Sequence, residues 1–140
     1  MALAISVSAP DGSAVSVSDL PANTPLPPAY AAPASPAGSV LTVAVAGELD
    51  LATAPELLNR VNDLIEAGHH RVVLDLGELT FCDSAGLSAL ARLRKKVAQF
   101  DGSLALARPT HIVRSVLELT GMTEVIPTFA TVREAIASVA

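Results

Sequence analysis

An acid and a hydroxyl stand side by side at Asp83-Ser84, within the stretch LTFCDSAGLSAL that begins at Leu79. A strand-like segment ends there, and small residues begin what the pattern predicts to be a helix. Such a pair can cap the helix, because Asp and Ser both accept hydrogen bonds from the free amides of the first turn. The serine can also be a catalytic nucleophile, or an acceptor that another protein modifies.

The surroundings of Ser84 disfavour catalysis. An esterase serine needs Gly-x-Ser-x-Gly to expose its oxygen on a strained turn, and here Cys82 occupies the first glycine position. The one later histidine, His111, has no obvious acid to orient it. A phosphatase loop built on Cys82 would need an arginine six residues on, where Ser88 stands, so a small buried thiol is the better interpretation. We therefore predict no catalytic residue and no enzyme.

Two further kinds of site are not supported by the sequence. His69 and His70 are adjacent on a predicted loop, so their side chains point apart, and no third ligand lies nearby; we predict no metal site. A glycine-rich phosphate loop of the Walker type is also missing, and no cofactor is expected.

Modification of Ser84 has a sound physical basis. A hydroxyl at an exposed helix start is accessible to a kinase, and phosphate would add about −1.5 to −2 charge next to Asp83. The amides and dipole of the helix tolerate that charge within the domain. An acidic or tightly packed partner would not, because like-charge contact costs several kcal/mol and about 1.4 kcal/mol changes affinity tenfold. A phosphorylation switch requires no other catalytic residue.

The composition restricts the class of protein. A chain of 140 residues is one domain's worth, and such a domain buries roughly two-thirds of its unfolded surface. Its 51% hydrophobic content includes one Tyr, three Phe and no Trp, which favours strands and helices packed through Ala, Val, Leu and Ile. The net charge of −5 argues against direct binding to nucleic acid. The one basic cluster is interpreted as a solvated helix face, formed by Arg92, Arg94, Lys95 and Lys96.

Cysteine use and hydropathy indicate the compartment. The single cysteine, Cys82, excludes an internal disulfide and fits a reducing environment. The start, MALAISVSAP, has no basic segment typical of a secretory signal. The charge-free stretch Leu20–Gly47 is long enough to suggest a membrane span, but seven of the ten prolines lie before Val40 and would break such a helix. We expect a cytoplasmic protein without membrane contact.

The organisation along the chain changes at Val40. Residues 1–39 are predicted to be an N-terminal strand or hairpin around Pro10-Asp11-Gly12, followed by a proline-rich connector. Residues 40–140 form the main domain, in which strands and helices alternate. Strands are predicted at residues 40–47, 71–79, 103–107 and 124–127. Helices are predicted at residues 53–68, 84–100, 109–119 and 131–140.

Helix boundaries are marked by capping residues. Thr53 with Glu56, and Thr131 with Glu134, have the spacing of capping boxes, and Gly68 suits a helix C-terminus. The helix after Ser84 is expected to bury five side chains, which are Leu87, Leu90, Leu93, Val97 and Phe100. Strand–helix alternation implies parallel pairing. We predict an α/β domain with a mostly parallel central sheet of four to five strands flanked by four helices.

Three segments carry a resemblance to a known family. They are VAVAGELDLATAPEL, RVVLDLGELTFCDSAGLSAL and VRSVLELTGMTEVIPTFATVREAI. The blocks Gly47–Asp50 and Asp83–Gly86 stand in the family's order and at its usual distance. Residues 40–140 thus resemble bacterial anti-sigma factor antagonists (anti-anti-sigma factors), single STAS domains of the SpoIIAA kind. The proline-rich connector departs from that pattern and leaves the role of the first residues open.

The resemblance implies a phosphorylation-switched regulatory protein. Unmodified, such a protein binds an anti-sigma factor serine kinase and so frees a sigma factor for transcription. The kinase phosphorylates the serine of the Asp-Ser motif, the complex dissociates, and a phosphoserine phosphatase restores the hydroxyl. By position, Ser84 is the phosphoacceptor, and the expected partner-binding residues are Asp50, Asp83, Ser84, Gly86 and Leu87. Two alternatives stay open: a non-catalytic STAS subunit of a larger signalling assembly or transporter complex, and a small hydrolase using Ser84.

Overall fold

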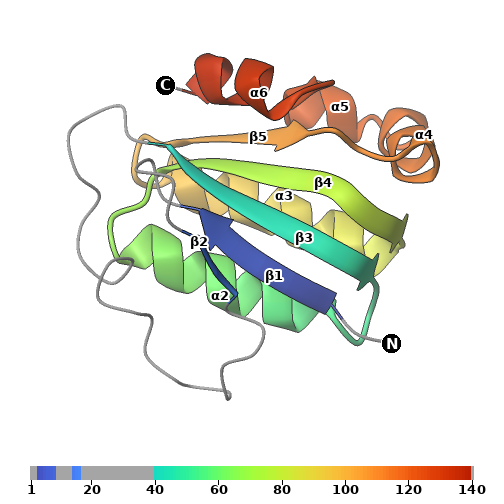
Figure 1. Ribbon diagram of the computed structural model, residues 1–140, viewed down its shortest axis with the longest axis horizontal. Coiled ribbons are helices and arrows are strands. Elements are labelled where there is room, and N and C mark those ends of the chain that lie inside the picture. Colours follow the sequence, from blue (N-terminus) through green and yellow to red (C-terminus); the bar gives the residue numbers. More distant parts are fainter. Residues whose placement is uncertain (1–2, 9–13, 17–39, 140) are drawn as a thin grey trace.

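The computed structural model describes residues 3–8, 14–16 and 40–139 (Figure 1). The strands are β1 (Leu3–Ser8), β2 (Ala14–Ser16), β3 (Leu41–Leu49), β4 (Arg71–Cys82), β5 (Ser103–Ala107) and β6 (Thr128–Phe129). The helices are α2 (Ala54–Glu66), α3 (Ser84–Ala98), α4 (His111–Leu119), α5 (Met122–Val125) and α6 (Val132–Val139).

The described strands form one sheet in the order β2-β1-β3-β4-β5-β6. Neighbours from β3 to β6 are parallel, whereas β1 runs antiparallel to both β2 and β3. The α/β fold class is therefore confirmed. The described sheet has six strands, more than the four to five expected, because the N-terminal segment contributes two. The short helix α5 is likewise additional to the four expected helices.

Two antiparallel strands come from the N-terminal segment. Ser8 of β1 pairs with Ala14 of β2, and Leu3 pairs with Gly47 of β3. Apolar side chains alternate along β1, and Leu3, Ile5 and Val7 are buried. This alternation is typical of an antiparallel strand with one face on a core. The turn predicted at Pro10-Asp11-Gly12 and the predicted proline-rich connector lie outside the described residues.

Helices cover the sheet from two sides (Figure 1). On one side α2 and α3 pack on a large aliphatic core that includes Val72 and Leu74 of β4. On the other side α6 packs on a smaller core. This core includes Val73, which lies between Val72 and Leu74 in β4. Successive side chains of β4 thus enter opposite cores, as expected for a strand buried on both faces.

Two predictions about elements were wrong in detail. The segment 124–127, expected to be a strand, contains the end of α5, and the strand begins only at Thr128, opposite Leu106. Gly121, at φ +76°, lets the chain start a new helical turn instead. Phe100 was expected to lie on the buried side of α3 but follows the helix, is 40% exposed and stacks on His70 at 4.5 Å between ring centroids.

Candidate functional site

Two strand-to-helix junctions meet at one edge of the sheet. Leu49 at the end of β3 and Cys82 at the end of β4 are register partners. The amide of Asp83 donates a hydrogen bond to the carbonyl of Leu49 at 3.2 Å. The carboxyl ends of parallel strands form the edge at which open α/β sheets usually place their sites. The segments carrying Asp50 and Ser84 are thereby brought together.

Asp83 is the cap of α3. Its backbone is extended, at φ −102° and ψ −169°, and its Oδ1 accepts a hydrogen bond from the amide of Gly86 at 3.0 Å. This is the geometry of an N-cap residue. The sequence left open whether Asp83 or Ser84 caps the helix, and the structure assigns that role to Asp83. Ser84 is then the first residue of the helix.

The Ser84 side chain is exposed. Within residues 3–8, 14–16 and 40–139, its hydroxyl forms no hydrogen bond, so it is not occupied as a cap. The first turn of α3 contains no acidic residue, in contrast to α2 and α6, which carry Glu56 and Glu134 there. The unpaired amides at a helix start favour an anion. The hydroxyl thus stands where an added negative charge is tolerated by the helix.

Gly86 allows α3 to approach β3 closely. A Cβ atom on Gly86 would lie 2.8 Å from Cys82 Sγ, 2.9 Å from Leu49 Cγ and 2.9 Å from the Leu49 carbonyl oxygen. The glycine is buried, whereas Leu87 beside it is half-buried and packs against the large core. Of these two expected partner-binding residues, Leu87 is the one whose side chain reaches the surface.

Asp50 organises the other junction. Its Oδ1 accepts hydrogen bonds from the amides of Ala52 and Thr53, both at 3.0 Å. The Thr53 hydroxyl accepts from the Asp50 amide at 2.9 Å and donates to the Glu48 carbonyl at 2.7 Å. The predicted capping box of Thr53 with Glu56 is therefore wrong: Thr53 is the N-cap, but its hydroxyl is used by the end of β3 instead.

Two large apolar side chains at this edge were missed from the sequence. Leu51, which lies in the turn between β3 and α2, is 79% exposed, and Phe81, next to the last residue of β4, is 43% exposed. Phe81 lies opposite Glu48 in the sheet register. The available signal was the alternation in β4, because a buried Cys82 makes its neighbour Phe81 point the other way. Exposed apolar residues of this size at a candidate site favour contact with another protein.

Cys82 is unsuited to nucleophilic chemistry. It is buried, and burial, together with the charge of Asp83, raises the pKa of its thiol to about 11. The thiolate, which is the reactive form, is therefore scarce near neutral pH. This result agrees with the interpretation of Cys82 as a small buried side chain.

The two adjacent histidines lie in different surroundings. His69 is buried, and His70 stacks on Phe100. In the part of the chain that the structure describes, no three His, Cys, Asp or Glu side chains lie close enough to hold a metal ion. Among the same residues, no helix is both long and apolar enough to cross a membrane.

Comparisons with known proteins agree with the fold. The family model for the STAS domain matches residues 33–135. BtrV of Bordetella bronchiseptica, provisionally named as an anti-sigma factor antagonist, is 34% identical over 99 residues, which are 71% of this chain and 84% of BtrV. A crystal structure of an anti-sigma factor antagonist from Mycobacterium paratuberculosis has a TM-score of 0.66 and 28% identity, over 75% of this chain and 88% of that one.

The SpoIIAA fold is also shared. The structure of the anti-sigma factor antagonist SpoIIAA in its unphosphorylated form has a TM-score of 0.60, over 69% of this chain and 84% of that one. At 23% identity this likeness concerns the fold alone.

Proposed function

The chain belongs to the STAS domain family, and we propose that it is an anti-sigma factor antagonist whose binding is switched off by phosphorylation of Ser84. One observation carries the proposal: the Ser84 hydroxyl is exposed at the first position of α3, while Asp83 performs the capping. Because no described hydrogen bond of the fold uses the Ser84 hydroxyl, a partner can cover it or an enzyme can modify it without breaking such a bond.

The unmodified site suits a protein partner. Leu51 and Phe81 offer apolar surface at the sheet edge, and Leu87 contributes a half-buried side chain at the start of α3. The carboxylate of Asp50 uses Oδ1 internally, and within the described residues its Oδ2 has no hydrogen bond. That oxygen and the Ser84 hydroxyl are available to the partner. In this proposal the partner is an anti-sigma factor with serine kinase activity.

Phosphorylation changes the charge of this surface without requiring a change of fold. The kinase transfers the γ-phosphoryl group of ATP to Ser84 Oγ: an O–P bond forms, ADP leaves, and the hydroxyl proton passes to a base of the kinase. The product places about −1.5 to −2 charge beside the Asp83 carboxylate. A partner seated there faces two anionic groups and dissociates. A phosphatase hydrolyses the phosphate ester and restores the hydroxyl. All of these proteins act together in the cytoplasm.

The test uses the purified cognate kinase with ATP, followed by mass spectrometry and calorimetry. Ser84→Ala should bind the kinase but accept no phosphate, and Ser84→Glu should bind at least about a hundredfold more weakly. Ser138→Ala is the control, because Ser138 is an exposed serine on α6 and does not line the surface around Ser84. This variant should still be phosphorylated at Ser84 and should bind the kinase as the unaltered chain does. Phosphate on any other residue, or unchanged binding of Ser84→Glu, would refute the switch.

A further inference from the structure

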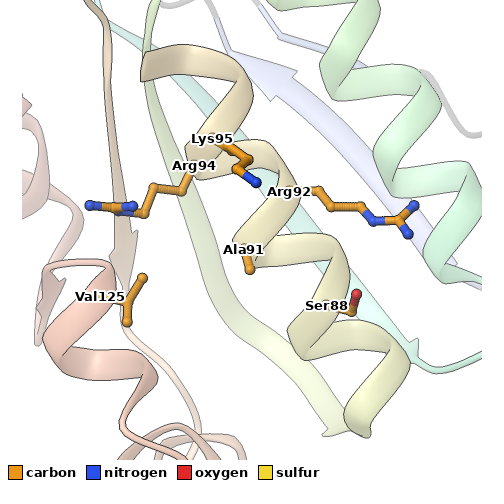
Figure 2. A pocket seen from close by; sticks show the side chains of 6 residues that line it. All are labelled: Ser88, Ala91, Arg92, Arg94, Lys95 and Val125. Carbon is orange, nitrogen blue, oxygen red and sulfur yellow. The ribbon is translucent and has the colours of Figure 1, made fainter. Parts of the chain in front are cut away.

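A groove runs along the outer face of α3. It has a volume of about 290 Å³ and lies between α3 and the end of α5. Its lining residues are Ser88, Ala91, Arg92, Arg94, Lys95 and Val125. In Figure 2, Arg94 extends on the side of Val125 and Arg92 on the opposite side of the helix, with Ala91 between them. The groove therefore has a small floor flanked by long cationic side chains.

The cations around the groove differ from their neighbour Lys96 in having no ion pair within the described residues. Lys96, the neighbour of Lys95, forms an ion pair with Glu66 at 2.8 Å. In contrast, Arg92, Arg94 and Lys95 have no ion-pair partner among the described residues, and the lining contains no acidic side chain. Three of the nine Lys and Arg residues thus surround one groove on a chain of net charge −5. Such a local concentration of one sign attracts groups of the opposite charge.

The groove begins close to Ser84. Ser88 lines it and follows Ser84 by four residues on the same helix. Four residues of α-helix rise about 6 Å, which is shorter than the Debye length of about 8 Å at physiological ionic strength. A phosphate on Ser84 would therefore repel an anion beside Ser88. Arg92, Arg94 and Lys95 stand further along, at least about 12 Å from Ser84 on the helix axis, so anions paired with them are largely screened from that phosphate.

We propose that the groove binds a carboxylate-bearing segment of the same protein that docks at Ser84. The inference rests on the proposed function and adds a second, electrostatic contact to it. Asp or Glu side chains of the partner pair with Arg92, Arg94 and Lys95, while its apolar surface covers Leu51 and Phe81. Nucleic acid fits less well, because the remainder of this acidic chain would repel its phosphates. Phosphorylation of Ser84 then disrupts the contact at the junction, whereas the groove contact lies too far along α3 to be switched directly by the phosphate.

The groove can be tested without the partner. The probe is a blocked twelve-residue peptide of alternating Glu and Leu, titrated into the full ¹⁵N-labelled chain and followed by NMR. We expect saturable shifts at residues 88–95 and Val125 that weaken as salt rises. A Gln-for-Glu peptide should produce none, and Ser84→Glu should bind the acidic peptide within about twofold of the unaltered chain, because the added charge lies more than a Debye length from Arg92, Arg94 and Lys95. Shifts located elsewhere, equal binding of the Gln peptide, or tighter binding of a duplex oligonucleotide at the same residues would overturn the proposal.

The partner protein supplies the second arm. Arg92→Gln combined with Lys95→Gln should lower affinity for the kinase about tenfold, since an exposed ion pair contributes a factor of a few. Arg133→Gln removes a charge from exposed α6 and should change affinity less than twofold. Unchanged affinity of the double variant, with Ser84 still phosphorylated, would refute the groove alone. Lack of phosphorylation at Ser84 in the unaltered chain would refute the proposed function, and the peptide titration would still report on the groove.

Discussion

The two strand-to-helix junctions at the sheet edge have similar ingredients and opposite uses. Each has an aspartate followed by a hydroxyl residue: Asp50 with Thr53, and Asp83 with Ser84. At the first, the Thr53 hydroxyl is buried, 7% exposed, and bonded to the Glu48 carbonyl. At the second, the Ser84 hydroxyl is exposed and has no bond within the described residues.

The difference follows from spacing. Thr53 stands three residues after its aspartate, so its hydroxyl returns to the end of β3 and closes the loop. Ser84 follows Asp83 directly, and Asp83 alone caps the helix. The Asp83 carboxylate supplies the acceptor that the cap needs, so the Ser84 hydroxyl is not used in a capping hydrogen bond. The position of each hydroxyl relative to its aspartate therefore decides whether the fold uses it in a hydrogen bond, and the comparison can be tested by exchanging or removing these groups.

The largest expected effect concerns accessibility of adjacent positions. In a Cys82→Ala, Ser84→Cys variant, the new thiol should react with maleimide at pH 8 at least about a hundredfold faster than Cys82 of the unaltered chain. A rise from the ordinary pKa of 9.0 to about 11 lowers the thiolate fraction of Cys82 by roughly that factor, before burial is counted. Similar rates for the two thiols would contradict the assignment of Ser84 as exposed and Cys82 as buried.

The Cys82 reaction should also depend on pH. Its rate should rise about tenfold per pH unit until about pH 11. Because the folded pKa exceeds the unfolded value, the native state holds this proton more tightly. The resulting contribution to stability is fully present below pH 9 and is lost as pH rises through 11.

The next effect concerns the close approach at Gly86. Gly86→Ala should lower the free energy of unfolding by about 1–3 kcal/mol, because its Cβ would overlap Cys82 Sγ and the Leu49 carbonyl. Urea unfolding measures this change. Ser88→Ala on the exposed face of the same helix should stay within about 0.5 kcal/mol. Equal stabilities of the two variants would show that α3 does not press on β3 here.

A smaller effect separates the two hydroxyls directly. Thr53→Val should cost about 1–2 kcal/mol, since it leaves the Asp50 amide and the Glu48 carbonyl unpaired. Ser84→Ala should cost less than about 0.5 kcal/mol. Thermal unfolding of the two variants under one buffer condition provides the comparison. A larger loss for Ser84→Ala would mean that its hydroxyl has a structural role.

The smallest effect concerns the cap of α3. Asp83→Ala should lower the free energy of unfolding by about 1 kcal/mol through loss of the bond to the Gly86 amide. Asp83→Asn retains an acceptor and should lose only a few tenths, and chemical denaturation resolves the two. If Asn costs as much as Ala, the charge of Asp83 rather than its acceptor oxygen stabilises the helix.

Local signals in the sequence predicted much of the fold. Gly68, at φ +115°, ends α2 as expected, and the amide of His69 bonds back to the Leu64 carbonyl. Thr131 accepts a hydrogen bond from the Glu134 amide, as the predicted capping box of α6 requires, but the Glu134 carboxylate accepts from the Thr131 hydroxyl and not from its amide. These features depend on residues a few positions apart. The strand–helix alternation could be predicted equally well, because the period of the apolar residues and the length of each segment distinguish strands from helices.

Features that depend on distant neighbours were not predictable. The Thr53 hydroxyl donates a hydrogen bond to the Glu48 carbonyl only because the loop after β3 folds back on the end of that strand. The position of β6 depends on its pairing with β5 rather than on the apolar run 124–127. At the candidate site, the sequence predicted that Asp83 and Ser84 lie at a strand-to-helix junction. It did not predict that Asp83 caps the helix while Ser84 stays exposed. The exposure of Leu51 was missed, because it depends on whether another segment packs over this position, which the sequence does not show.

Both outermost strands of the described sheet are short, with three residues in β2 and two in β6. A long, flat margin with unpaired backbone groups would act as a template for recruiting further chains into fibrils. Edge strands as short as β2 and β6 offer little such template. These two edges of the described sheet therefore give the folded domain little means of joining other copies through backbone hydrogen bonds.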